Sequence, residues 1–510
     1  MRFALLFLLS LAPAGQAGSP GYFAPAHRVS GIGVGRDDIS EELLAVRTDL
    51  MIQSQTFAIL RDPQAVPGAR RITGNLKLQA LFRTASQRSG MPASLIEAIA
   101  YLESWGEARA ESPSGPRGVM QISEATARSM GLKVVHATRH RTTREKVLVA
   151  SRRRKPKYRT VTHKTPYVVT VRDDRLSPDR AIPAAASYLA GMEQKFGGRD
   201  WAIFAYHCGQ GCVAEMLDLT RRARGIPHAT VPRMFFSCSP AWNRELYQAI
   251  QQQMLRDYSP TYYFRVKRAE QLLALYRRDA AAFISLAQEY RSEFGLNGFS
   301  PRAPHRLSVW LKRDDMIFHS CEEIRADLGK RLVKAFERPD YFGYALKLSP
   351  DAPANLEFFS EASPAAIGTL AYIAFETRRL HEELNPQGER FQPLEVTALV
   401  EPEDYARSLG RREALSHCSG QVFDIGYAGL PPGELECLRF VLNDLGWEGY
   451  LGFVEEGMEN LHIGCSPGSR DFFTTVFQEA LGNPDSGRYR AAPGAMIASR
   501  LLASGVPARW

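Results

Sequence analysis

A single acidic side chain, Glu103, ends an apolar run in which hydrophobic residues recur at intervals of three and four. That spacing predicts a helix with the carboxylate in its last turn. A turn rich in Ser, Gly and Pro follows from Ser112 and leads into a strip that ends in Met120 and Gln121. A helix-borne carboxylate in apolar surroundings has a raised pKa and stays protonated near neutral pH. We therefore expect one general acid that acts on a long polar polymer.

These residues resemble the catalytic core of the soluble lytic transglycosylase family. The family pattern is Glu-Ser, a Ser nine residues after the Glu, and then Gly-Ala-x-Gly-Leu-Met-Gln. The sequence matches it in register from Glu103 to Gln121, with Pro116 in place of Ala and Val119 in place of Leu. A second block, Ala205-Tyr206-His207-Cys208-Gly209, corresponds to the family's Ala-Tyr-Asn-Ala-Gly. Two blocks in the right order are a more specific signal than either alone.

The resemblance implies a peptidoglycan lytic transglycosylase that cleaves the β-1,4 bond between MurNAc and GlcNAc and leaves 1,6-anhydro-MurNAc ends. Glu103 would be the only acid/base, and no cofactor would be needed. The substrate-binding residues implied by the match are Ser112, Met120, Gln121, Tyr206 and His207. His207 stands where the family has Asn, and its imidazole titrates near neutrality. The alternative is that Met120 and Tyr206 are ordinary core residues.

The positive charge of the chain is concentrated in one segment. Residues 133–175 contain fourteen Lys or Arg against three acids, a net charge of +11, whereas the whole chain carries +9 and the remainder therefore sums to −2. β-prone runs on either side of Arg152–Arg154 predict a basic hairpin. Such a charge run is usually a solvated surface. It could also form a wall of the substrate groove that attracts anionic cell-wall polymer. Aromatic residues are sparse in it, so nucleic acid is not an expected partner.

The C-terminal half contains a second set of residues suited to chemistry. His417 and Asp424 lie on either side of a short Gly-containing turn, and Glu459 precedes His462 by three positions. Two His and one Asp are a sufficient ligand set for zinc with water as the fourth ligand. Glu459 could then act as a general base, and Glu455 and Glu456 precede His462 at other workable distances.

This pattern resembles the D-Ala-D-Ala carboxypeptidase and endolysin-type zinc peptidases, whose signature is His-x-x-Gly-x-Ala-x-Asp followed by Glu-x-x-His. Val422 replaces the Ala, and the Arg that polarises the scissile carbonyl in those peptidases is absent, with Glu401 near its expected place. Zinc binding is therefore better supported than peptidase activity. The alternative is a metal-free fold that keeps its His and Asp as core hydrogen-bonding residues.

Seven cysteines permit disulfides in an exported protein, although the odd count leaves at least one thiol over. Cys208 and Cys212 are one helical turn apart, so each is expected to pair with a distant partner such as Cys238. Cys418 and Cys465 flank the two His residues and are better disulfide candidates than metal ligands. The alternative for these cysteines is that they are small buried thiols.

A chain of 510 residues is expected to be multidomain. A positive start, a short apolar stretch and small residues predict a signal peptide over 1–17, hence an exported, periplasmic protein. No later stretch is long and apolar enough to be a transmembrane segment. We expect an N-terminal segment over 18–75, a mostly α, lysozyme-like transglycosylase domain over 76–240 with the basic insert at 133–175, a helical extension over 241–300, and an α+β zinc-peptidase-like domain over 301–510.

The expected partners are peptidoglycan glycan strands and proteins of the cell-wall machinery. Two other functions fit the same residues. One is a peptidoglycan-binding scaffold in which Glu103 no longer cuts, and the other is a goose-type muramidase, which shares the fold and the Glu but hydrolyses the bond. The products of cleavage distinguish the last of these, because hydrolysis adds water and transglycosylation does not.

Overall fold

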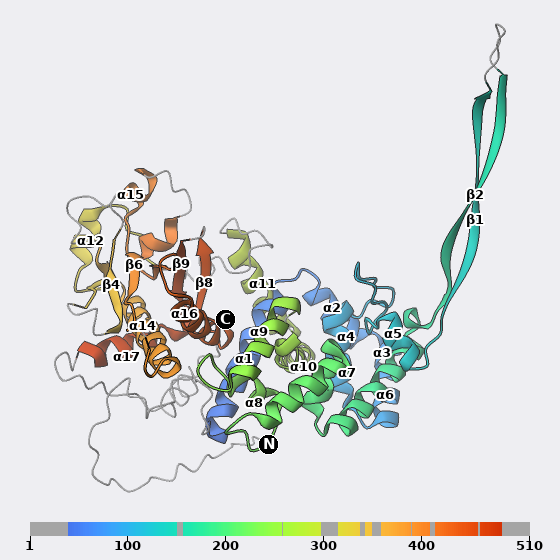
Figure 1. The fold of residues 1–510 in the computed structure, drawn as a ribbon, viewed down its shortest axis with the longest axis horizontal. Coiled ribbons are helices and arrows are strands. Elements are labelled where there is room, and N and C mark those ends of the chain that lie inside the picture. Colours follow the sequence, from blue (N-terminus) through green and yellow to red (C-terminus); the bar gives the residue numbers. More distant parts are fainter. Residues whose placement is uncertain are drawn as a thin grey trace. The chain divides into compact units, whose positions relative to one another are not determined.

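The computed structural model describes residues 39–149, 157–257, 259–296, 315–336, 342–348, 359–388, 390–408, 414–456 and 459–481 (Figure 1). The predicted signal peptide and the three arginines Arg152–Arg154 lie outside these ranges. Within them, no helix combines the length and the apolar character needed to cross a membrane.

The described residues divide into two compact units. The first, here called the helical unit, comprises Gln55–Asp218 and Gln252–Glu293. The second, here called the sheet unit, comprises the described residues of Met1–Ser54, Leu219–Gln251 and Phe294–Trp510. Each unit draws on separate stretches of the chain, whereas the sequence predicts consecutive domains with boundaries near 75, 240 and 300.

The helical unit contains the Glu103 motif and its supporting helices. These are α2 (Ala65–Gly74), α3 (Leu76–Ser89), α4 (Ala93–Ser104), α5 (Glu124–Ser129), α6 (Pro178–Phe196), most of α7 (Arg199–Arg222), η2 (Ser259–Thr261), α10 (Tyr262–Arg278) and most of α11 (Ala280–Leu296). Helix α4 begins after Pro92 and buries Leu95, Ile96 and Ile99 completely or nearly so. This apolar face is the one that the three-and-four spacing predicts.

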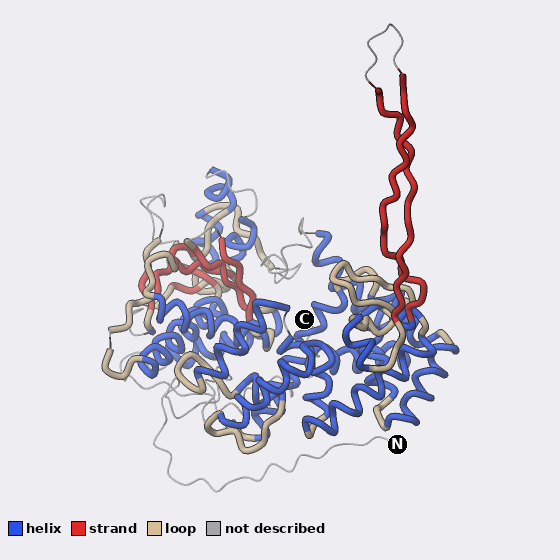
Figure 2. The backbone as a smooth tube through the Cα atoms, turned by 45° about the vertical axis from the view of Figure 1, so that its right-hand side comes forward, coloured by secondary structure: helices blue, strands red, loops and turns tan. Residues whose placement is uncertain are grey.

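The basic insert forms a long two-stranded ribbon. Strand β1 (Val134–Val149) pairs with β2 (Lys157–Asp173) in antiparallel register, with one irregularity between Val135 and His136. Figures 1 and 2 show the ribbon projecting away from the helices of its own unit. Its base is held by Asp174, which accepts hydrogen bonds from the backbone N–H of Lys133 (3.0 Å) and from Arg180 (2.6 Å). An isolated hairpin is marginally stable in water, so this anchoring at its base contributes to its order.

The sheet unit is built around a five-stranded sheet in the order β4-β6-β7-β9-β8. The strands are β4 (Tyr344–Leu346), β6 (Leu394–Ala398), β7 (Val422–Gly426), β9 (Asn460–Cys465) and β8 (Leu451–Glu456), and all neighbours are antiparallel except β4 and β6. A separate two-stranded pair joins β3 (Val333–Lys334) and β5 (Glu361–Ala362). The remaining elements are the first part of α1 (Glu41–Leu60), α8 (Val231–Phe236), most of α9 (Arg244–Asp257), α12 (Cys321–Asp327), α14 (Pro364–Leu384), α15 (Glu403–Ser408), η5 (Ala414–Ser419), α16 (Pro432–Trp447), η6 (Pro467–Ser469) and α17 (Arg470–Leu481).

Helix α14 packs against both α16 and α17 beside this sheet (Figure 1). Helix α14 is buried along most of its length. A side chain at Gly368 on α14 would place its Cβ 2.1 Å from the carbonyl oxygen of Phe473 on α17. Glycine is therefore required where these two helices cross, and the mixed α and β content of this region agrees with the predicted α+β class.

A buried ion cluster joins α1 to α16 within the sheet unit. The guanidinium of Arg47 donates to both carboxylate oxygens of Asp444 (2.7 and 2.8 Å) and to Glu448 (2.8 Å), and all three side chains are at least nine-tenths buried. The same guanidinium lies 4.3 Å from the centroid of the Phe236 ring. These contacts bring residues from the N-terminal region and from 219–251 into the same unit as the C-terminal sheet.

Candidate active site

Glu103 lies in the last turn of α4, where the helix ends. Trp105 and Gly106 both have positive φ angles, 54° and 74°, which stop the helix directly after the acid. The hydroxyl of Tyr262, the first residue of α10, donates a 2.6 Å hydrogen bond to Oε1 of Glu103. The carboxylate is therefore held by a residue from a distant part of the chain.

The surroundings of Glu103 favour its neutral form. Burial raises its pKa, while the hydrogen bond from Tyr262 and the positive charge of Arg265 lower it, and the balance is a pKa of about 7. The groups that act on Glu103 in the described part of the chain are thus a phenol and a guanidinium, and neither is a carboxylate. A carboxyl group with this pKa exchanges its proton readily at neutral pH.

The turn that follows α4 is fixed by hydrogen bonds to its backbone. Ser104 donates to the carbonyl of Val119 (2.8 Å), and the side-chain amide of Gln121 donates to the carbonyls of Ala110 (3.1 Å) and Gly118 (3.0 Å). Gly118 has a φ of 80°, and a Cβ there would lie 1.8 Å from the carbonyl oxygen of Arg175. The glycine lets this turn approach the base of the basic hairpin.

Ser112 and Met120 occupy different environments in this turn. Ser112 is partly exposed, and its hydroxyl lies 2.7 Å from that of Ser114. Met120 is fully buried, and its carbonyl accepts a 2.8 Å hydrogen bond from the hydroxyl of Tyr206. The side chain of Met120 therefore lies in the core, as the alternative interpretation of the motif expects.

Tyr206 lies on α7 close enough to Glu103 for the two groups to affect each other. Burial raises the pKa of Tyr206 well above its usual value, and the negative charge of Glu103 raises it further. The ring of Tyr206 also contacts that of Tyr188 edge-on, with centroids 6.3 Å apart. The hydroxyl that donates to Glu103 is nevertheless that of Tyr262.

His207 connects the second motif to Tyr262. Its ring packs on that of Tyr262 with centroids 4.6 Å apart, and its Nδ1 lies 2.9 Å from the hydroxyl of Ser259. Ser259 in turn donates to Asp257 (2.6 Å). Burial lowers the pKa of His207, the negative charge of Asp257 raises it, and the positive charge of Arg265 lowers it further. Tyr262 was not among the residues predicted from the sequence, because the only local signal is an aromatic pair at the start of a helix.

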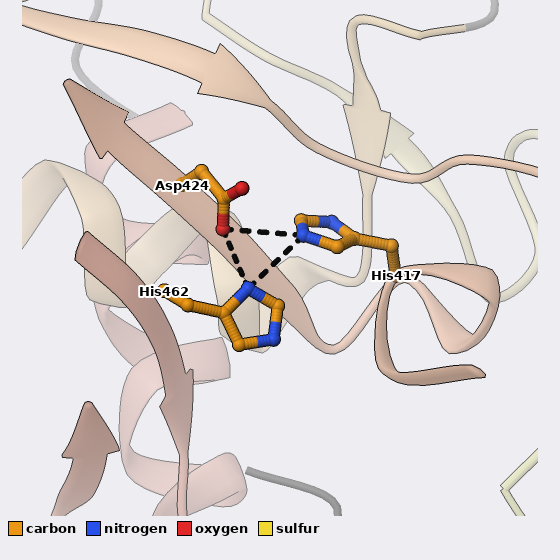
Figure 3. A group of neighbouring side chains, drawn as sticks. All are labelled: His417, Asp424 and His462. Atoms are coloured by element: carbon orange, nitrogen blue, oxygen red, sulfur yellow. Dashed lines mark hydrogen bonds and ion pairs between the residues drawn. The ribbon is translucent and has the colours of Figure 1, made fainter. Parts of the chain in front are cut away.

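A second cluster forms in the sheet unit from the three predicted metal ligands (Figure 3). His417 comes from η5, Asp424 from β7 and His462 from β9, and Asp424 and His462 face each other across the strand pair. Nε2 of His417 lies 3.1 Å from both Oδ1 of Asp424 and Nδ1 of His462, and the latter two atoms are 2.6 Å apart. All three side chains are buried.

The donor atoms in this cluster fit a zinc ion. Nδ1 of His417 lies 2.7 Å from the carbonyl oxygen of Leu399, which can only accept, so Nδ1 carries the proton and Nε2 faces the cluster. A second hydrogen bond of this kind commonly orients a zinc-binding His. Burial alone would lower the pKa of His417, but the negative charges of Asp424 and Glu401 outweigh it and raise it to about 9. Two imidazoles and a carboxylate would hold the metal and leave one position open.

The carboxylates around this cluster differ in burial. Glu459, the predicted base, is exposed in the turn before β9, whereas Glu401 is buried and close enough to act on His417. The position of Glu459 depends on the turn that precedes β9, and spacing in the sequence does not specify that turn.

The expected long-range disulfides are not formed. All seven cysteines lie in the described residues and are present as thiols, including Cys418 and Cys465, which are buried. The alternative interpretation, small buried thiols, therefore describes four of them, Cys238, Cys418, Cys437 and Cys465, while Cys208, Cys212 and Cys321 are only partly buried.

Comparison with known proteins identifies one matching family model, that of the transglycosylase SLT domain, which covers residues 80–149 and 158–227. The match contains Glu103, Tyr206 and His207 and ends before Tyr262 and before the His417 cluster. Most of this region of the transglycosylase SLT domain type therefore lies in the helical unit, which includes the matched residues up to Asp218.

Named relatives match over similar lengths. The chain is 32% identical over 132 residues to "Peptidoglycan transglycosylase gp16" of Escherichia phage T7, which is 26% of this chain and 8% of that protein. It is 27% identical over 154 residues to "Membrane-bound lytic murein transglycosylase F" of Alcanivorax borkumensis, which is 29% of this chain and 24% of that protein. The matches thus span less than a quarter of either relative.

A solved structure also matches in part. It is an inactive mutant of the lytic transglycosylase Slt from Pseudomonas aeruginosa, with 20% sequence identity and a TM-score of 0.24. The match covers 39% of this chain and 24% of that chain. Likeness at this level supports no inference about function.

Proposed function

We propose that this protein is a peptidoglycan lytic transglycosylase that cleaves the β-1,4 bond between MurNAc and GlcNAc, with Glu103 as its only acid/base. The observation that carries the proposal is the environment of Glu103, a carboxyl group with a pKa of about 7 that is held by Tyr262. The match of the surrounding residues to the transglycosylase SLT domain supports it.

The first step requires a protonated Glu103. The acid donates its proton to the oxygen that links MurNAc C1 to GlcNAc, the C1–O bond breaks, and the GlcNAc end leaves as an alcohol. Positive charge develops on the MurNAc ring as the bond breaks. Glu103 is then an anion, and the hydrogen bond from Tyr262 stabilises it, because a charged acceptor strengthens such a bond.

The second step uses the same carboxylate as a base. Glu103 takes the proton from the 6-hydroxyl of MurNAc as that oxygen bonds to C1, which closes the 1,6-anhydro ring and restores the acid. Glycosidases that hydrolyse their substrates generally pair two carboxylates. Among the described residues, the groups that act on Glu103 include no second carboxylate, which favours a substrate that provides its own nucleophile.

The other motif residues would position the glycan. Ser112 is partly exposed beside the turn and would hydrogen-bond to the departing sugar. Gln121 and the backbone of Met120, whose carbonyl accepts a hydrogen bond from Tyr206, would shape the floor of the groove, and His207 would place Tyr262 against Glu103. The exposed cations of β1 and β2, which project from the helices (Figure 1), would attract the anionic polymer.

Replacement of Glu103 tests this proposal. Glu103→Gln keeps the size of the side chain but cannot donate a carboxyl proton, so the rate of release of soluble fragments from peptidoglycan should fall by about two to four powers of ten. Glu107→Gln, an exposed change in the turn after α4, is the matched control and should retain activity. Release by Glu103→Gln at the wild-type rate would contradict the role of Glu103, whereas binding of peptidoglycan without release by either protein would favour the peptidoglycan-binding scaffold.

A second module is proposed for the sheet unit on the strength of the His417 cluster. We infer that His417, Asp424 and His462 bind one zinc ion, with Glu459 or the buried Glu401 as the nearby carboxylate. A zinc ion bound there would polarise a carbonyl or activate a water molecule. Lacking the carbonyl-polarising Arg of the peptidases that it resembles, the cluster supports metal binding more strongly than peptidase activity.

A further inference from the structure

The turn over residues 112–122 contains three residues with a left-handed backbone. Gly115, Gly118 and Gln121 have φ angles of 106°, 80° and 44°. Glycine adopts such angles at little cost, whereas the side chain of Gln121 disfavours them. A residue other than glycine stays in this conformation only where its surroundings hold it there. The 112–122 turn therefore depends on contacts that keep its shape.

A buried arginine supplies contacts to both halves of the 112–122 turn. Nη1 of Arg175 donates a hydrogen bond to the carbonyl oxygen of Gly115 and another to that of Ile122, each at 3.2 Å. Gly115 lies three residues after Ser112, and Ile122 directly follows Gln121. Arg175 is only 3% exposed, and shielding from water strengthens its hydrogen bonds. One nitrogen atom thus joins the two halves of the turn.

The base of the ribbon orients this guanidinium. Asp173, the last residue of β2, accepts hydrogen bonds from Nε (2.8 Å) and Nη2 (2.7 Å) of Arg175 on its two carboxylate oxygens. A paired contact of this kind fixes the plane of the guanidinium. Both side chains are almost completely buried. The pairing leaves Nη1 directed at the 112–122 turn.

The same turn is also attached to the helix that carries the acid. Ser104, which directly follows Glu103, donates a 2.8 Å hydrogen bond to the carbonyl oxygen of Val119. The turn is therefore held by α4 at one point and by Arg175 at two others. The two side chains of the turn that would meet the glycan are thereby kept in place relative to Glu103.

We propose that Arg175 is a positioning residue that holds the 112–122 turn in the shape that binds the glycan, without itself touching the reacting atoms. In the sequence this arginine is one of many cations of the basic insert, and it lies outside both motifs. Its burial against Asp173 separates it from the exposed cations that would attract the polymer. Its effect on activity rests on the proposed function, whereas its hold on the turn does not.

Hydrogen–deuterium exchange of the full chain tests that hold. The N–H groups of Gly115 and Ile122 donate to other residues of the turn, so their exchange reports its opening. Arg175→Lys keeps a positive charge beside Asp173, but an ammonium group lacks the planar fork that makes all these contacts at once. Peptides that cover residues 112–122 should then exchange about tenfold faster, the factor that loss of one ordinary hydrogen bond carries.

Two further variants make this result specific. Arg199→Lys makes the same change at an exposed ion pair of the helical unit and should exchange as the wild-type protein does. The double variant Asp173→Asn/Arg175→Met removes both charges of the buried pair, so that neither is left without its partner. It should show the faster exchange of the 112–122 turn as well. Wild-type exchange of this turn in Arg175→Lys, or in the double variant, would overturn the proposal.

The kinetics of fragment release from peptidoglycan separate positioning from a loss of folded protein. Arg175→Lys should raise KM about tenfold and change kcat little, because the turn would contact the glycan before and during the reaction. The fall of the rate with pH should stay centred at about 7, because burial, Tyr262 and Arg265 set the pKa of Glu103. A lower kcat at unchanged KM, as a smaller folded fraction gives, or a moved pH profile would refute the positioning role. A wild-type protein that releases no fragments would instead count against the proposed function, because the exchange is measured without it.

Discussion

Replacing Tyr262 by Phe should move the pH dependence of the reaction to higher pH. The substitution removes only the hydroxyl that donates a 2.6 Å hydrogen bond to Glu103 and keeps the ring that packs on His207. This hydrogen bond favours the ionised form of Glu103 and thereby lowers its pKa, against the larger effect of burial. Without it, the carboxyl group should hold its proton more tightly.

The size of the shift follows from the strength of the bond. Hydrogen bonds to charged groups contribute about 1.5–3 kcal/mol, and one pKa unit corresponds to about 1.36 kcal/mol. The pKa of Glu103 should therefore rise from about 7 by about 1–2 units. Since the first step needs protonated Glu103, the rate of the wild-type protein should fall as the pH rises through about 7. In Tyr262→Phe the same fall should begin at about pH 8–9.

The assay is the rate of fragment release from peptidoglycan as a function of pH. It is run under conditions where kcat/KM is measured, because the pKa values in that profile are those of the free protein. Tyr263→Phe is the matched control, because it makes the same chemical change one position along α10 and should leave the profile in place. A profile of Tyr262→Phe that is unmoved, or that moves to lower pH, would refute the assignment of Tyr262 as the residue that sets the pKa of Glu103.

Three further predictions concern other parts of the molecule. In the basic hairpin, Gln should replace either the set Arg139, Arg141 and Arg144 or the set Arg152–Arg154. Each replacement should weaken co-sedimentation with peptidoglycan sacculi and make that binding less sensitive to salt, because exposed charges act through screened attraction. An unchanged salt dependence would indicate that the hairpin is only a solvated surface. Elemental analysis should find one zinc ion per chain. His417→Ala should lose this zinc, and the exposed control His319→Ala should keep it. Zinc that remains in His417→Ala would exclude the cluster as its site. Arg47→Met should lower the free energy of unfolding of the sheet unit by about 3–5 kcal/mol, because Asp444 and Glu448 lose their buried partner. The control Arg244→Met, at an exposed ion pair, should lower it by about 0–1 kcal/mol. Equal losses of unfolding free energy in a denaturation experiment would contradict this prediction.

Much of each site could be predicted where the sequence pattern is local. The spacing before Glu103 predicts the helix and the apolar setting that raise its pKa. Alternation along two strands predicts that Asp424 and His462 share a face, and the register pairs them directly. In both cases a few neighbouring residues determine the geometry.

Other features depend on contacts between distant residues and had no local signal. Tyr262 reaches Glu103 from a helix 159 positions further along the chain, and Arg47 meets Asp444 across 397 positions. The interleaving of the two units follows from contacts of this kind, which composition and periodicity do not encode. Likewise, helix α7 is interrupted at Gly209, which has a non-helical backbone conformation with φ 82° and ψ 165°, and the periodicity of the sequence does not mark this break.

The central claim is that, with Glu103 as acid and base, C1 of MurNAc becomes bonded to the substrate's own 6-hydroxyl oxygen and not to the oxygen of water. The most direct test is to digest peptidoglycan with the purified protein in oxygen-18-labelled water, without added metal, and to weigh the released muropeptides by mass spectrometry. The account predicts 1,6-anhydro ends that are one water lighter than hydrolysed ends and that carry no heavy oxygen. Reducing ends that contain heavy oxygen would contradict it and would identify the protein as a muramidase.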